Sequence, residues 1–200
     1  MRLIEREHAL EVLDDALATA LAGSGQLVLI GGEAGVGKTI LVSHFCAEQR
    51  ARVLWGTCDA LFTPRPLGPL LDVAEVAGGS LEATTGAGAL PHDVARELTR
   101  ELEREPTVLV LDDLHWADEA TLDVVMLLGR RIARLPALIL GTYRDDEIGR
   151  THPLQIVLGE LSTTRSLRRL RVEPLSPSGV GELAAPYGVD AEALHRVTGG

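Results

Sequence analysis

The sequence predicts an α/β fold in which helices cover both faces of a central parallel sheet. Three short, strongly apolar segments, 26–30, 107–111 and 137–143, have the continuous hydrophobicity of strands that are buried on both faces. Segments with apolar residues at helical spacing lie between them. This alternation is typical of a three-layer sandwich, with the sheet as its middle layer.

The elements of the first half alternate as this fold requires. Apolar residues at helical spacing predict a first helix over 8–22, which Gly23 and Gly25 end. The next expected elements are a strand at 26–30, a helix from 38 to about 49, a strand at 52–56, a loop at 57–69 with Pro64, Pro66 and Pro69, a short helix at 70–77, a flexible connection at 78–90, and a helix from Pro91 to Pro106.

The second half continues the alternation. The expected elements are a strand at 107–111 that runs into Asp112-Asp113, an amphipathic helix at 119–135 that Pro136 stops, a strand at 137–143, a helix at 153–161 and a strand at 167–172. Pro174 and Pro177 then interrupt regular structure. We therefore expect a core domain over 1–172 and a separate segment over 173–200.

Composition restricts the partners and the compartment. The formal net charge of −10 argues against direct contact with nucleic acid, which needs clustered basic residues. The N-terminus is charged where a signal peptide is apolar, and no apolar run approaches the roughly 20 residues that span a bilayer. Cys46 and Cys58 form no CxxC pair. These features predict a cytoplasmic protein that does not bind membranes.

A complete G-x-x-x-x-G-K-[ST] motif follows the first predicted strand: Gly32-Glu33-Ala34-Gly35-Val36-Gly37-Lys38-Thr39. Its glycines allow backbone N–H groups to surround a phosphate at the positive end of the next helix. Lys38 would reach the β- and γ-phosphates, and Thr39 would bind Mg²⁺. Of the 19 basic residues only Lys38 is a lysine, which indicates a chemical requirement for an ammonium there. The alternative is an ordinary turn with a surface lysine, but the flanking strand and helix favour phosphate binding.

Two acids end the apolar strand at 107–111. In phosphate-transferring P-loop proteins an acid at such a strand end orders the magnesium ion, and Asp112 fits this role. Asp113 is then placed to polarise the attacking water, although a shorter acid than the usual Glu predicts slow hydrolysis. Without the phosphate-binding motif, an Asp-Asp pair would more simply cap the following helix.

Arg144 follows the apolar strand at 137–143. Ligands of parallel sheets bind at the carboxyl ends of the strands, so Arg144 could contact the γ-phosphate and sense it. The alternative is a solvated arginine that pairs with Asp145, Asp146 or Glu147. We interpret His115-Trp116 as packing against the end of the preceding strand.

Taken together, these motifs resemble the AAA-type ATPase domain of the signal-transduction NTPases, the STAND class. The similarity is greatest to the N-terminal part of LuxR-family, MalT-like transcriptional regulators. It is carried by Glu5-Arg6-Glu7, the segment 32–39, Leu111-Asp112-Asp113-Leu114-His115-Trp116-Ala117-Asp118, Gly141-Thr142-Tyr143-Arg144, His152-Pro153-Leu154, Pro174-Leu175-Ser176 and Thr198-Gly199-Gly200. The match covers essentially the whole chain, and the Asp-Asp-Leu-His-Trp-Ala-Asp phrase is its most specific part.

The resemblance implies a P-loop NTPase core and the beginning of a helical lid from 173. It implies a switch that holds ADP at rest, self-associates with ATP and Mg²⁺ bound, and resets by slow hydrolysis. Pro174 would contact the adenine side of the nucleotide. Glu5 departs from the glycine that the family has before Arg6 and Glu7. The chain stops inside the lid, so DNA would be bound only through a domain outside it.

Other functions have less support. A metabolic P-loop kinase would need an acceptor site and an Arg-rich lid. An ATP-binding module of a cyclase or kinase, without turnover of its own, stays possible because Asp113 stands in place of Glu. A GTPase is disfavoured because Lys38 is the only lysine available for an Asn-Lys-x-Asp base-reading motif.

Overall fold

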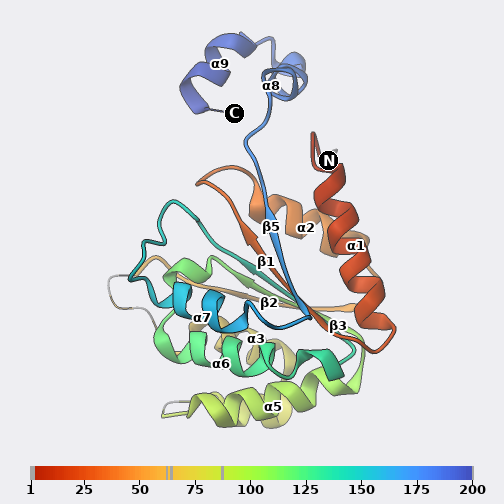
Figure 1. Ribbon diagram of the computed structural model, residues 1–200, viewed down its shortest axis with the longest axis vertical. Coiled ribbons are helices and arrows are strands. Elements are labelled where there is room, and N and C mark those ends of the chain that lie inside the picture. Colours follow the sequence, from red (N-terminus) through yellow and green to blue (C-terminus); the bar gives the residue numbers. More distant parts are fainter. Residues whose placement is uncertain (1–2, 62, 64, 87, 200) are drawn as a thin grey trace.

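The computed structural model describes residues 3–61, 63, 65–86 and 88–199, so Pro64 and Gly200 lie outside the described residues. The helices and strands follow the predicted order closely (Figure 1). Their bounds are α1 Glu7–Leu21, β1 Gln26–Gly31, α2 Lys38–Glu48, β2 Arg52–Thr57, α3 Gly68–Ala77, α4 Gly79–Thr84, α5 Pro91–Arg104, β3 Thr107–Asp112, η1 Leu114–Trp116, α6 Glu119–Gly129, η2 Ile132–Arg134, β4 Ala137–Thr142, α7 Pro153–Leu161, β5 Leu167–Arg171, α8 Pro177–Ala184, η3 Ala185–Tyr187 and α9 Ala191–Thr198.

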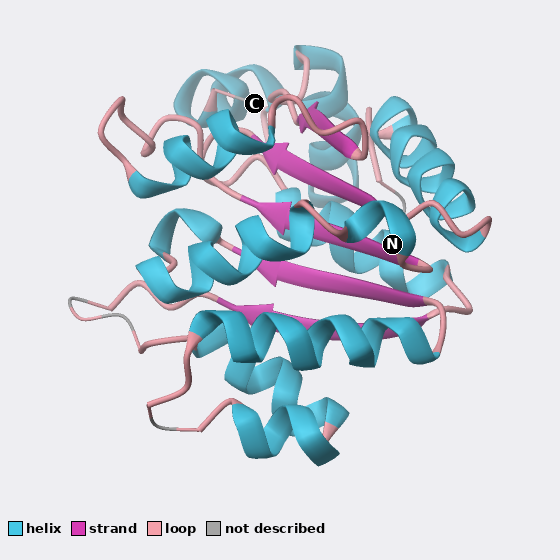
Figure 2. Cartoon of the chain, turned by 60° about the horizontal axis from the view of Figure 1, so that its bottom comes forward, coloured by secondary structure: helices cyan, strands magenta, loops and turns pink. Residues whose placement is uncertain are grey.

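The sheet has five strands in the order β2-β3-β4-β1-β5, and every neighbouring pair is parallel. The arrows of Figure 2 accordingly point in one direction, so that all carboxyl ends lie at one edge. The register sets Ile30 of β1 beside Thr142 of β4, and Leu111 of β3 beside Gly141. The segments that leave β1, β3 and β4 are therefore neighbours, which brings the predicted site residues together.

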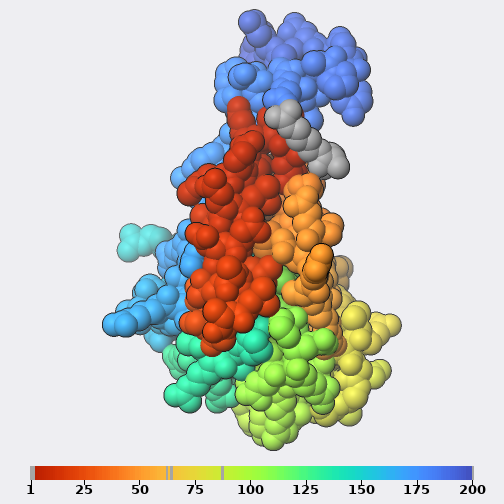
Figure 3. Space-filling view, turned by 90° about the vertical axis from the view of Figure 1, so that its right-hand side faces the viewer, coloured from red at the N-terminus to blue at the C-terminus, as the bar shows by residue number. Residues whose placement is uncertain are grey.

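Alternate residues of the strands enter two separate cores, one on each face of the sheet. Val28 and Ile30 of β1 pack with α1 and α2 on one face. Leu27 and Leu29 of the same strand pack on the other face with residues of α3, α5, α6 and α7. Figures 1 and 3 show α1 and α2 side by side on the first face. This burial on both sides confirms the predicted three-layer α/β fold.

Two elements differ from the sequence prediction. Segment 78–90 is not wholly a flexible connection, because it contains α4, whose Leu81 is 1% exposed and anchors the helix in the core. The helix expected over 119–135 ends at Gly129, and the chain turns into η2. A Cβ on Gly129 would lie 2.9 Å from Leu161, so the helix packs closely at this point before the turn buries Ile132.

The final helices stand apart from the core. After β5 the chain passes Pro174 and forms α8 and α9 beyond the carboxyl edge of the sheet, next to the N-terminal segment (Figures 1 and 3). Ser176 caps α8 by accepting from the Gly179 N–H, so the helix begins directly after the proline-containing segment. Within the described residues no helix combines the length and the hydropathy that crossing a membrane would require.

Candidate functional site

The segment 32–39 forms a loop between β1 and α2, at the carboxyl edge of the sheet. Gly35 and Gly37 have φ angles of 79° and 95°, in the left-handed region that L side chains rarely adopt. Added Cβ atoms at these two positions would meet nothing within 4 Å, so backbone conformation is what requires glycine there. The loop thus has the shape that exposes backbone N–H groups at the N-terminus of α2.

Lys38 is the first residue of α2 and is 6% exposed, so it is not the surface lysine of the alternative interpretation. Its ammonium donates hydrogen bonds to the carbonyl oxygens of Gly32 and Glu33, each at 2.7 Å. Burial lowers the pKa of Lys38, while the charge of Asp113 opposes that effect. The chain therefore holds a desolvated ammonium against the loop that would surround the phosphates.

Asp112 ends β3 and is 4% exposed. One carboxylate oxygen accepts from the Thr39 hydroxyl at 3.0 Å, and the Thr142 hydroxyl donates to the other. Three oxygen-bearing side chains from α2, β3 and β4 thus meet at one point. Carboxylate and hydroxyl oxygens are the ligands that Mg²⁺ prefers, so this donor set fits the magnesium ion expected with a bound nucleotide.

Asp113 follows β3 with a φ of 58°, in the left-handed conformation. Its backbone N–H donates to the Thr142 hydroxyl at 2.8 Å, so one threonine fixes the positions of both acids. Burial, and then the charge of Asp112, raise the pKa of Asp113. A carboxylate with a raised pKa is a better proton acceptor, as a water-activating base requires.

Arg144 lies at the same edge as the acids, and its charge acts on both Lys38 and Asp113. Its guanidinium pairs with the Glu147 carboxylate and lies 4.8 Å from the centre of the Trp116 ring. The pairing matches the alternative weighed above, but Arg144 is only 28% exposed. The guanidinium is therefore held between Glu147 of its own loop and Trp116 of η1.

A pocket of about 190 Å³ opens beside the loop of residues 32–39, on the side of the N-terminal segment and α8. Its side chains come from three separate segments: Leu3, Ile4, Arg6, Val36, Ile40, Leu175 and Leu183. This mainly apolar lining suits the flat face of a base. The lining contains Leu175 and not its neighbour Pro174, and Leu3 and Ile4 carry no sequence signal of their own.

The N-terminal segment contacts both the loop of residues 32–39 and the start of α8. Arg6 is buried and donates to the Val36 carbonyl at 3.0 Å. Glu5 has a φ of 55°, in the left-handed region that favours glycine, the residue that the family resemblance led us to expect at this position. The carboxylate of Glu5 accepts from the Ser176 N–H at 2.8 Å and from the Ser176 hydroxyl. Glu5 therefore ties the start of the chain to the N-cap of α8.

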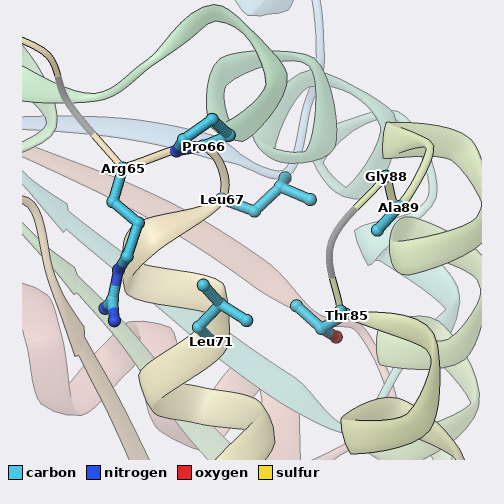
Figure 4. A pocket seen from close by; sticks show the side chains of 8 residues that line it. Arg65, Pro66, Leu67, Leu71, Thr85, Gly88 and Ala89 are labelled. Carbon is cyan, nitrogen blue, oxygen red and sulfur yellow. The ribbon is translucent and has the colours of Figure 1, made fainter.

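A larger cavity of about 520 Å³ lies between the segment before α3 and the segment after α4 (Figure 4). Leu67, Leu71, Thr85 and Ala89 line it, and its one basic residue, Arg65, pairs with Asp72 at 2.8 Å. None of the predicted site residues lines this cavity, so its size does not make it the nucleotide site.

This arrangement, a glycine-rich loop with a buried lysine after β1 and paired acids at the end of β3, which β4 separates from β1, defines a P-loop NTPase. The family model described as "AAA ATPase domain" matches residues 2–140, and the chain belongs to that family. A curated relative is an uncharacterized protein of Rhizobium meliloti (strain 1021), 26% identical over 249 residues. That match covers 99% of this chain and 24% of the relative, so the chain spans about a quarter of the relative's length.

Two solved structures share the fold. One is the Aeropyrum pernix ORC1 protein in complex with DNA, with a TM-score of 0.65 and 19% identity over 94% of this chain and 50% of that chain. The other is a Pyrococcus horikoshii STAND protein with a tetratricopeptide repeat sensor, with a TM-score of 0.59 and 20% identity over 99% of this chain and 28% of that chain. They confirm the predicted AAA-type P-loop fold.

Proposed function

We propose that the chain is the nucleotide-dependent switch of a larger signal-responsive regulator, one that binds ATP with Mg²⁺ and hydrolyses it slowly. The observation that carries this proposal is the convergence of Lys38, Thr39 and Asp112 at the carboxyl edge of the sheet. A phosphate-binding ammonium and a set of oxygen ligands for a divalent cation are what a nucleoside triphosphate requires.

The residues around this cluster have separable roles. The loop of residues 32–39 binds the phosphates, while the pocket between Leu175 and Ile4 receives the base. Thr39 and Asp112 hold Mg²⁺, which offsets the charge of the phosphates when it is bound. Asp113, whose pKa burial raises, accepts a proton from the attacking water.

The switch itself depends on distinguishing ATP from ADP. Arg144 is near enough for its charge to act on Lys38 and Asp113, and its present partner Glu147 is an exposed acid that a γ-phosphate can replace. With ADP the pair with Glu147 persists, and with ATP the guanidinium moves to the γ-phosphate. A state-dependent change at this edge next to the lid supports self-association of the ATP form.

The proposal extends to the class of regulator. The phrase 111–118 and the STAND fold relative support a place in a LuxR-family, MalT-like transcriptional regulator, with DNA contacted by a domain outside this chain. An ATP-binding module of a cyclase or kinase is the second candidate. It is favoured by Asp113, which is shorter than the usual Glu.

The test is the ratio of the ATP and ADP dissociation constants at fixed magnesium, for the wild type and Arg144→Ala. A charge-assisted contact contributes roughly 1.5–3 kcal/mol, so the variant should lose about tenfold to hundredfold of its preference for ATP and little affinity for ADP. An unaltered ratio would remove Arg144 from the site. Phosphate release measured alongside separates the two candidates, because a module without turnover binds ATP and releases none.

A further inference from the structure

His115 is the one described residue whose side chain is buried with polar atoms that have no hydrogen-bond partner. Its side chain is 1% exposed and stacks against Trp116, with ring centroids 4.5 Å apart. Leaving two polar nitrogens unpaired in a buried place is costly, and such groups in native proteins call for an explanation. The proposed hydrolysis mechanism does not use this residue.

The two ring nitrogens face two different acids. Nδ1 lies 3.8 Å from a carboxylate oxygen of Asp113, and Nε2 lies 3.6 Å from a carboxylate oxygen of Glu147. Both separations are slightly too long for hydrogen bonds, and small movements would close either one. His115 thus sits between the proposed base and the acid that pairs with Arg144.

The ring can satisfy only one of these acids as a donor. Burial, the largest effect, lowers the pKa of His115 to about 4, so the ring is neutral near pH 7 and carries a single N–H. The backbone of His115 is fixed separately: its carbonyl accepts from His152 Nε2 at 3.1 Å, while His152 Nδ1 accepts from the Leu154 N–H. The remaining freedom of His115 is therefore which nitrogen bears the proton.

We propose that His115 is a positioning residue that transmits the pairing of Arg144 to Asp113 through the choice of its tautomer. While Arg144 holds Glu147, the charge of Glu147 is offset and the His115 proton stays on Nδ1, directed at Asp113. When Arg144 leaves, the uncompensated carboxylate of Glu147 draws the proton to Nε2. A lone pair on Nδ1 then faces Asp113 and makes that carboxylate a stronger base.

This inference rests on the proposed function, because it deepens the role of Arg144 as a γ-phosphate sensor. The change of tautomer makes Asp113 a stronger base only after Arg144 has moved, so that hydrolysis follows recognition of the γ-phosphate. The same arrangement accounts for the burial of an unpaired imidazole beside the Arg144–Glu147 pair. Its electrostatic neighbours from other elements are Lys38 and His152.

The test is the ring-nitrogen NMR signature of His115, since two-bond proton–nitrogen couplings distinguish the Nδ1–H and Nε2–H tautomers. His115→Phe assigns the signals, and His152 serves as an internal control that should stay Nε2–H throughout. In nucleotide-free protein, Arg144→Ala should shift the His115 ratio towards Nε2–H by about tenfold, equivalent to about 1.4 kcal/mol. Glu147→Gln should keep the proton on Nδ1. An unchanged ratio in Arg144→Ala overturns the inference.

A measurement with bound nucleotide separates a failure of this inference from a failure of the proposed function. Wild-type protein with Mg²⁺ and an ATP analogue bearing a non-hydrolysable β–γ bridge should show the same shift as Arg144→Ala. If only the variant shifts, the link from Arg144 to His115 stands and the γ-phosphate sensor fails. Single-turnover hydrolysis tests the last step: Glu147→Gln should be slower by about tenfold, although it should bind ATP at least as tightly as the wild type because Arg144 no longer has to leave a carboxylate. A Glu147→Gln rate equal to the wild type overturns the action of His115 on Asp113.

Discussion

Replacing Thr142 by Val should disturb both acids of the site at once. Thr142 is fully buried, its hydroxyl donates to Asp112, and it accepts from the Asp113 N–H. A hydrogen bond to a charged group contributes about 1.5–3 kcal/mol, and an unpaired buried N–H costs about 1–3 kcal/mol. These effects overlap, so Thr142→Val should lower the free energy of unfolding by about 2–4 kcal/mol.

Thr142→Ser is the matched control, because it keeps the hydroxyl and removes one methyl group. The lost methyl should cost only about 1 kcal/mol. Urea denaturation gives both free energies, and titration of ATP at several magnesium concentrations reports the metal site. Only the valine variant should lose magnesium-dependent tightening of ATP binding. Equal stability of the two variants, with unchanged magnesium dependence in Thr142→Val, would refute the bridging role of this hydroxyl.

The remaining predictions concern the acids and the lid. Asp112→Asn should abolish magnesium-dependent tightening of ATP binding, whereas Asp113→Asn should spare binding and slow phosphate release, because metal ordering acts on the ground state and water activation on the transition state. Identical behaviour of the two in binding and turnover assays would contradict this division. Glu5→Gly should relieve the left-handed strain but release Ser176, so that limited proteolysis cuts near 173–177 faster than in the wild type. An unchanged cleavage rate would show that Glu5 does not hold the lid.

The fold was predictable because its signals are contiguous in the chain. Strands such as 107–111 are buried on both faces and are therefore apolar at every position after the first, and the core they form is the one observed. The prediction of a flexible connection at 78–90 was wrong in part, because one buried side chain, Leu81, is enough to anchor a short helix. The two leucines of this Gly- and Ala-rich segment, Leu81 and Leu90, lie too far apart to give a periodicity to detect.

The site was predictable only as far as single motifs extend. Lys38, Thr39 and Asp112 lie within contiguous patterns, and the structure places them together. The bridging role of Thr142 depends on the register between β3 and β4, and the pocket beside residues 32–39 joins Leu3 to Leu175 across almost the whole chain. Such long-range contacts are properties of the packed fold. A single sequence, taken on its own, does not display them.

The most direct test of the nucleotide-switch account is the affinity of the wild type, Lys38→Ala and Lys38→Arg for a fluorescent ATP analogue with Mg²⁺. Lys38 is desolvated against the carbonyls of Gly32 and Glu33, and a phosphate contact of its ammonium contributes roughly 1.5–3 kcal/mol. Both variants should therefore bind about tenfold to hundredfold more weakly, arginine included because its planar fork does not replace a compact ammonium. Thermal melting of the same samples confirms that they are folded. Wild-type affinity in folded Lys38→Ala would contradict the account.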